Sequence, residues 1–116
     1  MRRVLVVEDE PLIRLAAIDA LEDSRFTVLD AASADAAMDI IGEEAIHFLF
    51  TDIQTPGVHT GVDLAHAVHL RFPDAGIVVV SGRLTPADIQ LPPNAQFVSK
   101  PYMFEHIVRR LRSIEP

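Results

Sequence analysis

The chain has 116 residues, of which 49% are hydrophobic and 23% are charged. This length and composition suit one folded domain over residues 1–116, and they exclude a multidomain enzyme and a chain disordered by its composition. Ten basic and 17 acidic residues give a net charge of −7, which disfavours binding to nucleic acid or to an anionic membrane.

Redox and targeting signals indicate the cytoplasm. The sequence contains no cysteine, which excludes disulfide bonds and thiolate metal sites. The apolar run at residues 4–7 is followed by Glu8 and is too short for a signal peptide or a membrane span. We therefore expect a cytoplasmic protein without membrane contact.

The first half of the chain alternates short apolar runs with longer amphipathic stretches. The β-branched run at residues 4–7 is typical of a strand buried on both faces, and Pro11 suits the first turn of a helix. The predicted elements are a strand at 4–7, a helix at 10–23, a strand at 26–31, a helix from its N-cap Ser33 to near Gly42, and a strand at 46–51.

The second half continues this alternation after a loop that contains Pro56 and Gly61. Pro92 and Pro93 must keep the fourth helix brief, because proline cannot continue a helix. The predicted elements are a helix at 62–72, a strand at 76–80, a brief helix that Thr85 caps, a strand at 96–99 and a helix at 102–114.

Strands that alternate with helices predict an α/β fold, in which a parallel sheet with right-handed crossovers has helices on both faces. In such sheets, ligands bind beyond the carboxyl ends of the strands. Chemically useful side chains are therefore expected at those ends.

Five polar side chains follow four of the predicted strands: Glu8 and Asp9, Asp52, Ser81, and Lys100. Carboxylates in one crevice raise each other's pKa unless a cation joins them, and Mg²⁺ prefers oxygen ligands. A carboxylate beside such a cation can attack phosphorus, while an ammonium and a hydroxyl neutralise the phosphoryl oxygens. We expect Asp52 to be this nucleophile.

This pattern resembles the receiver domain of two-component response regulators, over residues 3–114. The resemblance implies a flavodoxin-like (βα)5 doubly wound sheet with strand order 2-1-3-4-5, here with a shortened fourth helix. The matching residues are the acidic pair Glu8-Asp9, the phosphoacceptor Asp52, the hydroxyl residue Ser81, the switch aromatic Phe97 and the pair Lys100-Pro101.

The resemblance also implies how the cation is bound. Asp9 and Asp52 would bind Mg²⁺, or Mn²⁺ in its place, directly. Glu8 would act through water, and Gln54 would contribute its backbone carbonyl. The loop after Asp52 departs from the usual pattern, because the segment before Pro56 lacks the common methionine and the loop has one extra residue.

The remaining matches imply a conformational switch. Lys100 would pair with Asp52 and then with the phosphoryl group. Ser81 would hydrogen-bond a phosphoryl oxygen and draw its loop inward, which lets Phe97 change rotamer. The peptide bond before Pro101 is expected to be cis, as X-Pro bonds can be.

The function implied is that of a signalling switch and not of an enzyme, since the domain would catalyse only its own phosphorylation and dephosphorylation. The donor would be a histidine kinase or a histidine phosphotransfer protein, and the signal would pass to an unidentified downstream protein. We expect a monomer or weak dimer, because the shortened fourth helix alters the face that usually carries the dimer contact.

The helix at 10–23 has more apolar residues than one face requires. Leu15 and Ile18 point away from its predicted core stripe. Kinases and phosphotransferases lay a helix against this element in receiver domains, so both residues are candidate docking residues. The predicted core stripe consists of Ile13, Ala16, Ala17 and Ala20.

Two alternative functions are open. A degenerate receiver would bind partners without being phosphorylated, but it predicts the loss of an acidic residue or the lysine, whereas Asp9, Asp52 and Lys100 are all present. A phosphohydrolase of the haloacid dehalogenase type also has a nucleophilic aspartate after a strand. That family requires a second aspartate two residues later, where this chain has Gln54.

Overall fold

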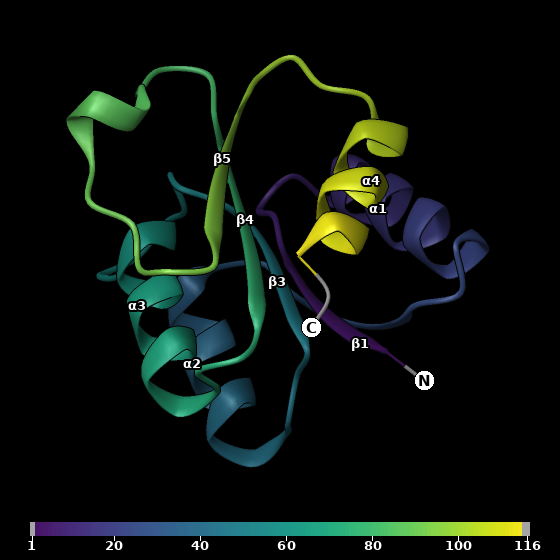
Figure 1. Ribbon diagram of the computed structural model, residues 1–116, viewed down its shortest axis with the longest axis horizontal. Coiled ribbons are helices and arrows are strands. Elements are labelled where there is room, and N and C mark those ends of the chain that lie inside the picture. Colours follow the sequence, from purple (N-terminus) through teal and green to yellow (C-terminus); the bar gives the residue numbers. More distant parts are fainter. Residues whose placement is uncertain (1, 115–116) are drawn as a thin grey trace.

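The computed structural model of the protein describes residues 2–114, in which five parallel strands alternate with helices (Figure 1). The strands are β1 (Arg3–Val7), β2 (Thr27–Ala31), β3 (Phe48–Asp52), β4 (Gly76–Ser81) and β5 (Ala95–Ser99). The helices are α1 (Pro11–Asp23), α2 (Ala34–Glu43), α3 (Gly61–Arg71), the single 3-10 turn η1 (Pro86–Asp88) and α4 (Phe104–Ser113). The strand order β2-β1-β3-β4-β5 confirms the predicted topology. Within residues 2–114, no helix is both long and apolar enough to cross a membrane.

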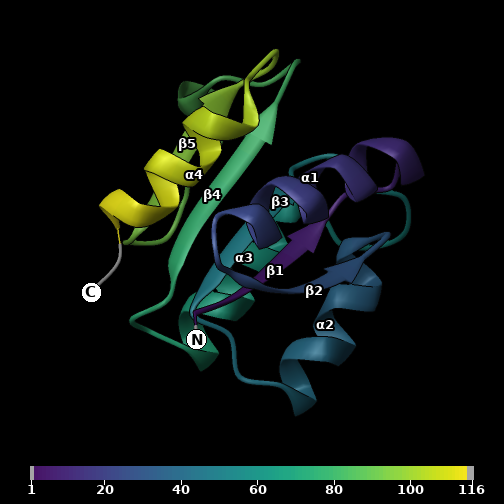
Figure 2. The same ribbon diagram turned by 90° about the vertical axis from the view of Figure 1, so that its right-hand side faces the viewer.

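The sheet lies between two layers of helices, with α1 and α4 on one face and α2 and α3 on the other (Figures 1 and 2). Side chains of a strand alternate between the faces. In β1, Leu5 and Val7 therefore pack in the core beneath α2 and α3, whereas Val4 and Val6 pack in the core beneath α1 and α4. Because both faces are buried, the strand is apolar throughout, as the sequence predicts.

The connection between β4 and β5 differs from the prediction, because the expected fourth helix is only the 3-10 turn η1. The backbone N–H of Thr85 donates to Oδ2 of Asp88 at 2.8 Å, which caps this turn locally. Pro92 and Pro93 then prevent helical continuation. The predicted shortening is confirmed, but the described part of the chain has four α-helices and not five.

The predicted core stripe of α1 is partly wrong. Ala17 and Leu21 are buried, one turn apart, whereas Ile13 is 42% exposed and Ala16 is exposed. The contacts of Arg14 account for this orientation of α1. Its Nη1 donates to the carbonyl of Glu8 at 2.8 Å, and its Nε lies 3.3 Å from Oδ2 of Asp30. The helix therefore turns Arg14 toward the sheet edge and Ile13 toward solvent.

Candidate functional site

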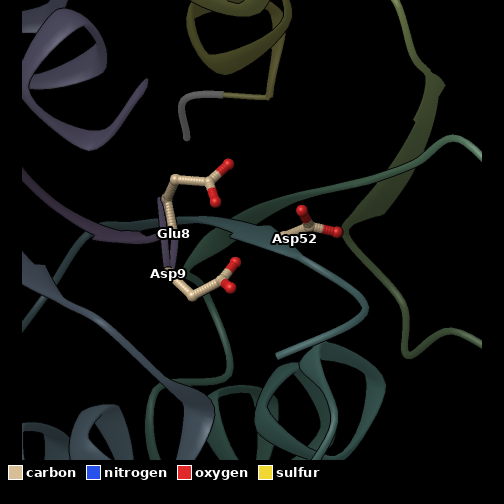
Figure 3. Close-up of side chains that lie close together, drawn as sticks. All are labelled: Glu8, Asp9 and Asp52. Atoms are coloured by element: carbon tan, nitrogen blue, oxygen red, sulfur yellow. The ribbon is translucent and has the colours of Figure 1, made fainter. Parts of the chain in front are cut away.

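Three carboxylates meet at the carboxyl end of the sheet. Val7 of β1 pairs with Thr51 of β3, so Glu8 and Asp9 emerge next to Asp52. Each of these three side chains offers one oxygen, and the three oxygens lie within 4.8 Å of one another. Figure 3 shows the three carboxylates directed toward a shared space. The structure thus brings together the acidic residues that the sequence singles out.

Burial makes this acidic group electrostatically costly. Glu8 is 6% exposed and Asp52 is 7% exposed, whereas Asp9 is exposed. Burial raises the pKa of Glu8, and the neighbouring charge of Asp52 adds to the increase, although a hydrogen bond from the Glu10 N–H opposes it. Burial also raises the pKa of the Tyr102 hydroxyl to about 12, with Glu8 and Asp52 contributing. Sequence reasoning missed Tyr102, because only the fold places its ring beside β3.

The donor set fits a hard divalent cation. Carboxylate oxygens are the ligands that Mg²⁺ prefers, and a cation between them removes the repulsion that burial strengthens. Lys100 supplies one positive charge to this group of three carboxylates, which leaves an excess of negative charge. The residues present therefore suit the predicted Mg²⁺ better than an anion.

Lys100 reaches the predicted nucleophile directly. Its Nζ lies 2.5 Å from Oδ2 of Asp52, and its backbone N–H donates to the carbonyl of Ser81 at 2.9 Å. The Lys100–Pro101 peptide bond is cis, as expected. The ammonium is thus held at the end of β5, where it can neutralise negative charge on the Asp52 side chain.

The other oxygen of Asp52 contacts the loop that follows β3. The backbone N–H of Gln54 donates to Oδ1 of Asp52 at 3.2 Å. This contact places the Gln54 main chain beside the phosphoacceptor candidate, whereas the residue as a whole is exposed. The geometry is compatible with the predicted role of the Gln54 backbone carbonyl, which stays a prediction.

Ser81 ends β4 and is 2% exposed. Its Oγ accepts hydrogen bonds from the backbone N–H groups of Arg83 at 3.1 Å and Leu84 at 3.0 Å. A hydroxyl can donate as well as accept, so Ser81 can still offer its own hydrogen to a phosphoryl oxygen. The residue therefore connects the site to the start of the β4–β5 connection.

Phe97 of β5 is half-buried and pairs with Val79 in the sheet. It packs against the core beneath α2 and α3, as do Leu84 and Leu91 from the β4–β5 connection. Phe97, the predicted switch residue, is thus near the β4–β5 connection, whose Arg83 and Leu84 are hydrogen-bonded to Ser81. Its change of rotamer stays a prediction.

The candidate docking residues lie apart from the carboxylates, on α1. Leu15 is 56% exposed, as predicted, whereas Ile18 is only partly exposed. Leu12 is 74% exposed and Ile13 42%, so the apolar surface of α1 is shifted toward its N-terminus. Sequence periodicity missed this shift because it assigned Ile13 to the buried face of α1.

A comparison with protein-family models matches residues 4–112 to the response regulator receiver domain. The chain belongs to this family. The observed strand order is the one expected for a receiver domain. The haloacid dehalogenase alternative is not supported, since the family match covers nearly the whole chain.

Curated relatives and solved structures agree with this assignment. The chain is 32% identical over 94% of its length to the hydrogenase transcriptional regulatory protein HoxA of Cupriavidus necator, but it spans only 23% of that protein. It is 28% identical to the response regulator receiver protein CpdR of Brucella abortus, and the match covers 98% of this chain and 97% of CpdR. The response regulator TrrA of Thermotoga maritima, solved in complex with Mg²⁺-BeF, superposes with a TM-score of 0.85 at 23% identity, covering 98% of this chain and 99% of that one.

Proposed function

We propose that this receiver domain accepts a phosphoryl group on Asp52 from a phosphohistidine of a histidine kinase or phosphotransfer protein, and signals by a change of conformation. The observation that carries the proposal is the position of the Asp52 carboxylate, which contacts the Lys100 ammonium and lies close to the carboxylates of Glu8 and Asp9. This arrangement provides a nucleophile, an ammonium that balances its charge, and two further carboxylates that can help to hold a cation.

In the proposed transfer, a carboxylate oxygen of Asp52 attacks phosphorus, the phosphorus–nitrogen bond of the donor breaks, and the imidazole leaves with the electron pair and takes up a proton. Lys100 neutralises charge on the transferring oxygens. Asp9, Asp52 and the Gln54 carbonyl would hold Mg²⁺, with Glu8 acting through water; the bound cation supplies further charge neutralisation at the phosphoryl group.

The reaction would make the domain a switch and not an enzyme with an external substrate. Phosphorylation of Asp52 would redistribute inactive and active conformations. Ser81 supports this step because its Oγ contacts both Arg83 and Leu84 and can also donate a hydrogen bond toward the site. Phe97 is the proposed reporter of that movement.

The first experiment is intact mass spectrometry after incubation with Mg²⁺ and acetyl phosphate. The parent chain should gain the mass of one phosphoryl group, and Asp52→Asn should gain none. Asp39→Asn, an exposed aspartate on α2, is the matched control and should be labelled like the parent. Labelling of Asp52→Asn would show that another residue is the acceptor, and no labelling of any chain despite Mg²⁺ binding would favour a receiver that requires a specific kinase or is degenerate.

The donor would dock beside the site, where the structure has an apolar groove of about 450 Å³. The groove is continuous with the exposed N-terminal part of α1 through Ile13. A helix of the donor protein could bury its apolar face there. The groove is lined by Glu8, Ile13, Lys100, Pro101, Tyr102 and Phe104.

Leu15→Asp tests whether the exposed apolar residues of α1 beside this groove belong to the donor interface. We expect the variant to keep its stability and its labelling by acetyl phosphate, which needs no docking, but to take phosphate more slowly from a phosphorylated histidine donor. Leu70→Asp is the control, since Leu70 is 85% exposed on α3. Equal transfer rates in the parent and Leu15→Asp would remove Leu15 from the donor interface.

A further inference from the structure

The loop between β3 and α3, residues 53–60, is attached to the N-terminus of α2 by a carboxylate from a distant part of the sequence. Asp35 in the first turn of α2 accepts a hydrogen bond on Oδ2 from the Val58 N–H at 3.0 Å, and one on Oδ1 from the His59 N–H at 2.8 Å. The Nδ1 of His59 lies 2.7 Å from the same Oδ1. One side chain therefore holds two consecutive backbone groups and one imidazole.

The loop backbone is shaped around this carboxylate. Gly57 has a φ of +107°, and a Cβ built on it would lie 2.3 Å from Oδ2 of Asp35. A side chain at position 57 would thus be strained and would collide with Asp35. The close approach requires glycine at this position.

Thr55 makes a second connection on the other side of the loop. Its Oγ1 accepts a hydrogen bond from the Ala34 N–H at 3.2 Å and donates one to the carbonyl of His59 at 3.2 Å. Ala34 and Asp35 are consecutive residues of α2, so the helix holds the loop at two points. The loop conformation depends on α2 as well as on the strand from which it emerges.

The same loop carries Gln54, whose N–H donates to Oδ1 of Asp52 at 3.2 Å and which is next to Thr55. Any movement of the loop away from α2 would therefore move the Gln54 main chain relative to Asp52. Hydrogen bonds from the Val58 and His59 backbone lower the pKa of Asp35, so its carboxylate is ionised at neutral pH and can make all of these contacts.

We propose that Asp35 is a positioning residue, which fixes the β3–α3 loop so that the Gln54 main chain is already beside Asp52 before a divalent cation binds. The inference rests on the proposed function, because it assigns Gln54 to the cation site. Without Asp35, part of the binding free energy would be consumed in ordering the loop, so affinity for the cation would fall.

The test is the affinity for Mg²⁺ alone, measured by isothermal titration calorimetry, with urea unfolding of each chain as a check that it is folded. Asp35→Ala should raise the Kd for Mg²⁺ about tenfold. Asp39→Ala is the matched control, because Asp39 lies one turn further along α2 and carries the same charge, and its Kd should equal that of the parent. A parent-like Kd in folded Asp35→Ala would overturn the inference.

A second variant separates the contact from the charge. Gly57→Ala keeps Asp35 ionised but places a methyl group against its carboxylate, so it should also raise the Kd for Mg²⁺. A normal Kd in Gly57→Ala would count against the inference even if Asp35→Ala failed to fold. If the parent bound Mg²⁺ and was labelled on Asp52 while both variants bound normally, only this inference would fail; if the parent bound no Mg²⁺, the proposed function would fail with it.

Discussion

Two segments border the candidate site, and the structure holds them in different ways. The β3–α3 loop, residues 53–60, is bonded to α2 through Asp35 and Thr55, and the Gly61 N–H at the start of α3 donates to the carbonyl of Ile53 at 2.7 Å. The β4–β5 connection, residues 82–94, is held mostly by local bonds from Ser81 and within the turn η1. Its bonds to α3 and the segment after it are those from His66 to the Gln90 carbonyl at 2.8 Å and from Asn94 to the Pro73 carbonyl at 3.0 Å.

This difference suggests that the two segments have different roles in the proposed switch. The loop that carries Gln54 has several hydrogen bonds to another element, so it can keep the proposed cation site in one geometry. The connection that begins after Ser81 has fewer such hydrogen bonds, although Leu84 and Leu91 pack against the core, so we expect it to move more readily when the site changes.

Gly61→Ala, directly after the β3–α3 loop, should destabilise the folded chain more than any of the changes that follow. A Cβ at this position would lie 2.1 Å from the backbone oxygen of Asp52 and 2.8 Å from the Cα of Ile53, and backbone atoms cannot rotate away. We expect the free energy of unfolding to fall by about 2–3 kcal/mol in urea denaturation. The control is Gly42→Ala in α2, where nothing lies within 4 Å of the new Cβ, which should raise stability by up to about 1 kcal/mol.

Ser81→Ala should loosen the other segment. The change removes the acceptor for the Arg83 and Leu84 N–H groups, which we expect to cost about 1 kcal/mol of unfolding free energy and to speed hydrogen exchange at these two amides. Ser99→Ala, at the exposed end of β5, is the control and should change neither quantity. Unchanged exchange at both amides in Ser81→Ala would mean that the hydroxyl does not restrain the connection.

His66→Ala should have a smaller effect, confined to the same segment. It removes the hydrogen bond to the Gln90 carbonyl, at a cost of roughly 0.5–1 kcal/mol. Limited proteolysis should cut residues 82–94 faster in the variant than in the parent. Cleavage within residues 53–60 is the internal control, and faster cleavage there as well would contradict the independence of the two segments.

Asp35 should make a small contribution to the pH dependence of folding stability. Its pKa is lowered below the ordinary value of 3.8, chiefly by the Val58 N–H and then by His59, so the ionised carboxylate stabilises the folded chain above that value. As pH falls through the lowered pKa, this contribution is lost. The stability difference between the parent and Asp35→Asn should therefore shrink below about pH 4; a difference unchanged down to pH 2 would argue against the contacts of Asp35.

Much of the site could be predicted from the sequence because it depends on strand ends. A run such as residues 4–7 indicates a strand buried on both faces, and parallel strands direct their carboxyl ends to one edge of the sheet. The positions of Asp52 and Lys100 follow from this rule, and the structure places their charged atoms 2.5 Å apart. The cis bond before Pro101 came from the family resemblance and is confirmed.

Other features of the structure cannot be recognised from a short stretch of sequence. The contact between Asp35 and His59 joins residues 24 positions apart, and it uses backbone N–H groups, which every residue except proline carries. The rotation of α1 depends on the bonds of Arg14 to Glu8 and Asp30, so counting apolar residues assigns Ile13 to the wrong face.

The succession of strands and helices, the acidic group at the end of the sheet and the family can all be read from the sequence, because alternating hydrophobicity and the side chains that follow each strand are local features. The hydrogen bonds from α2 to the β3–α3 loop, the smaller number that restrain the β4–β5 connection and the solvent-facing side of α1 appear only in the folded chain. Those outcomes depend on hydrogen bonds and packing between distant segments, whose geometry exists only once the sheet and its helices have come together.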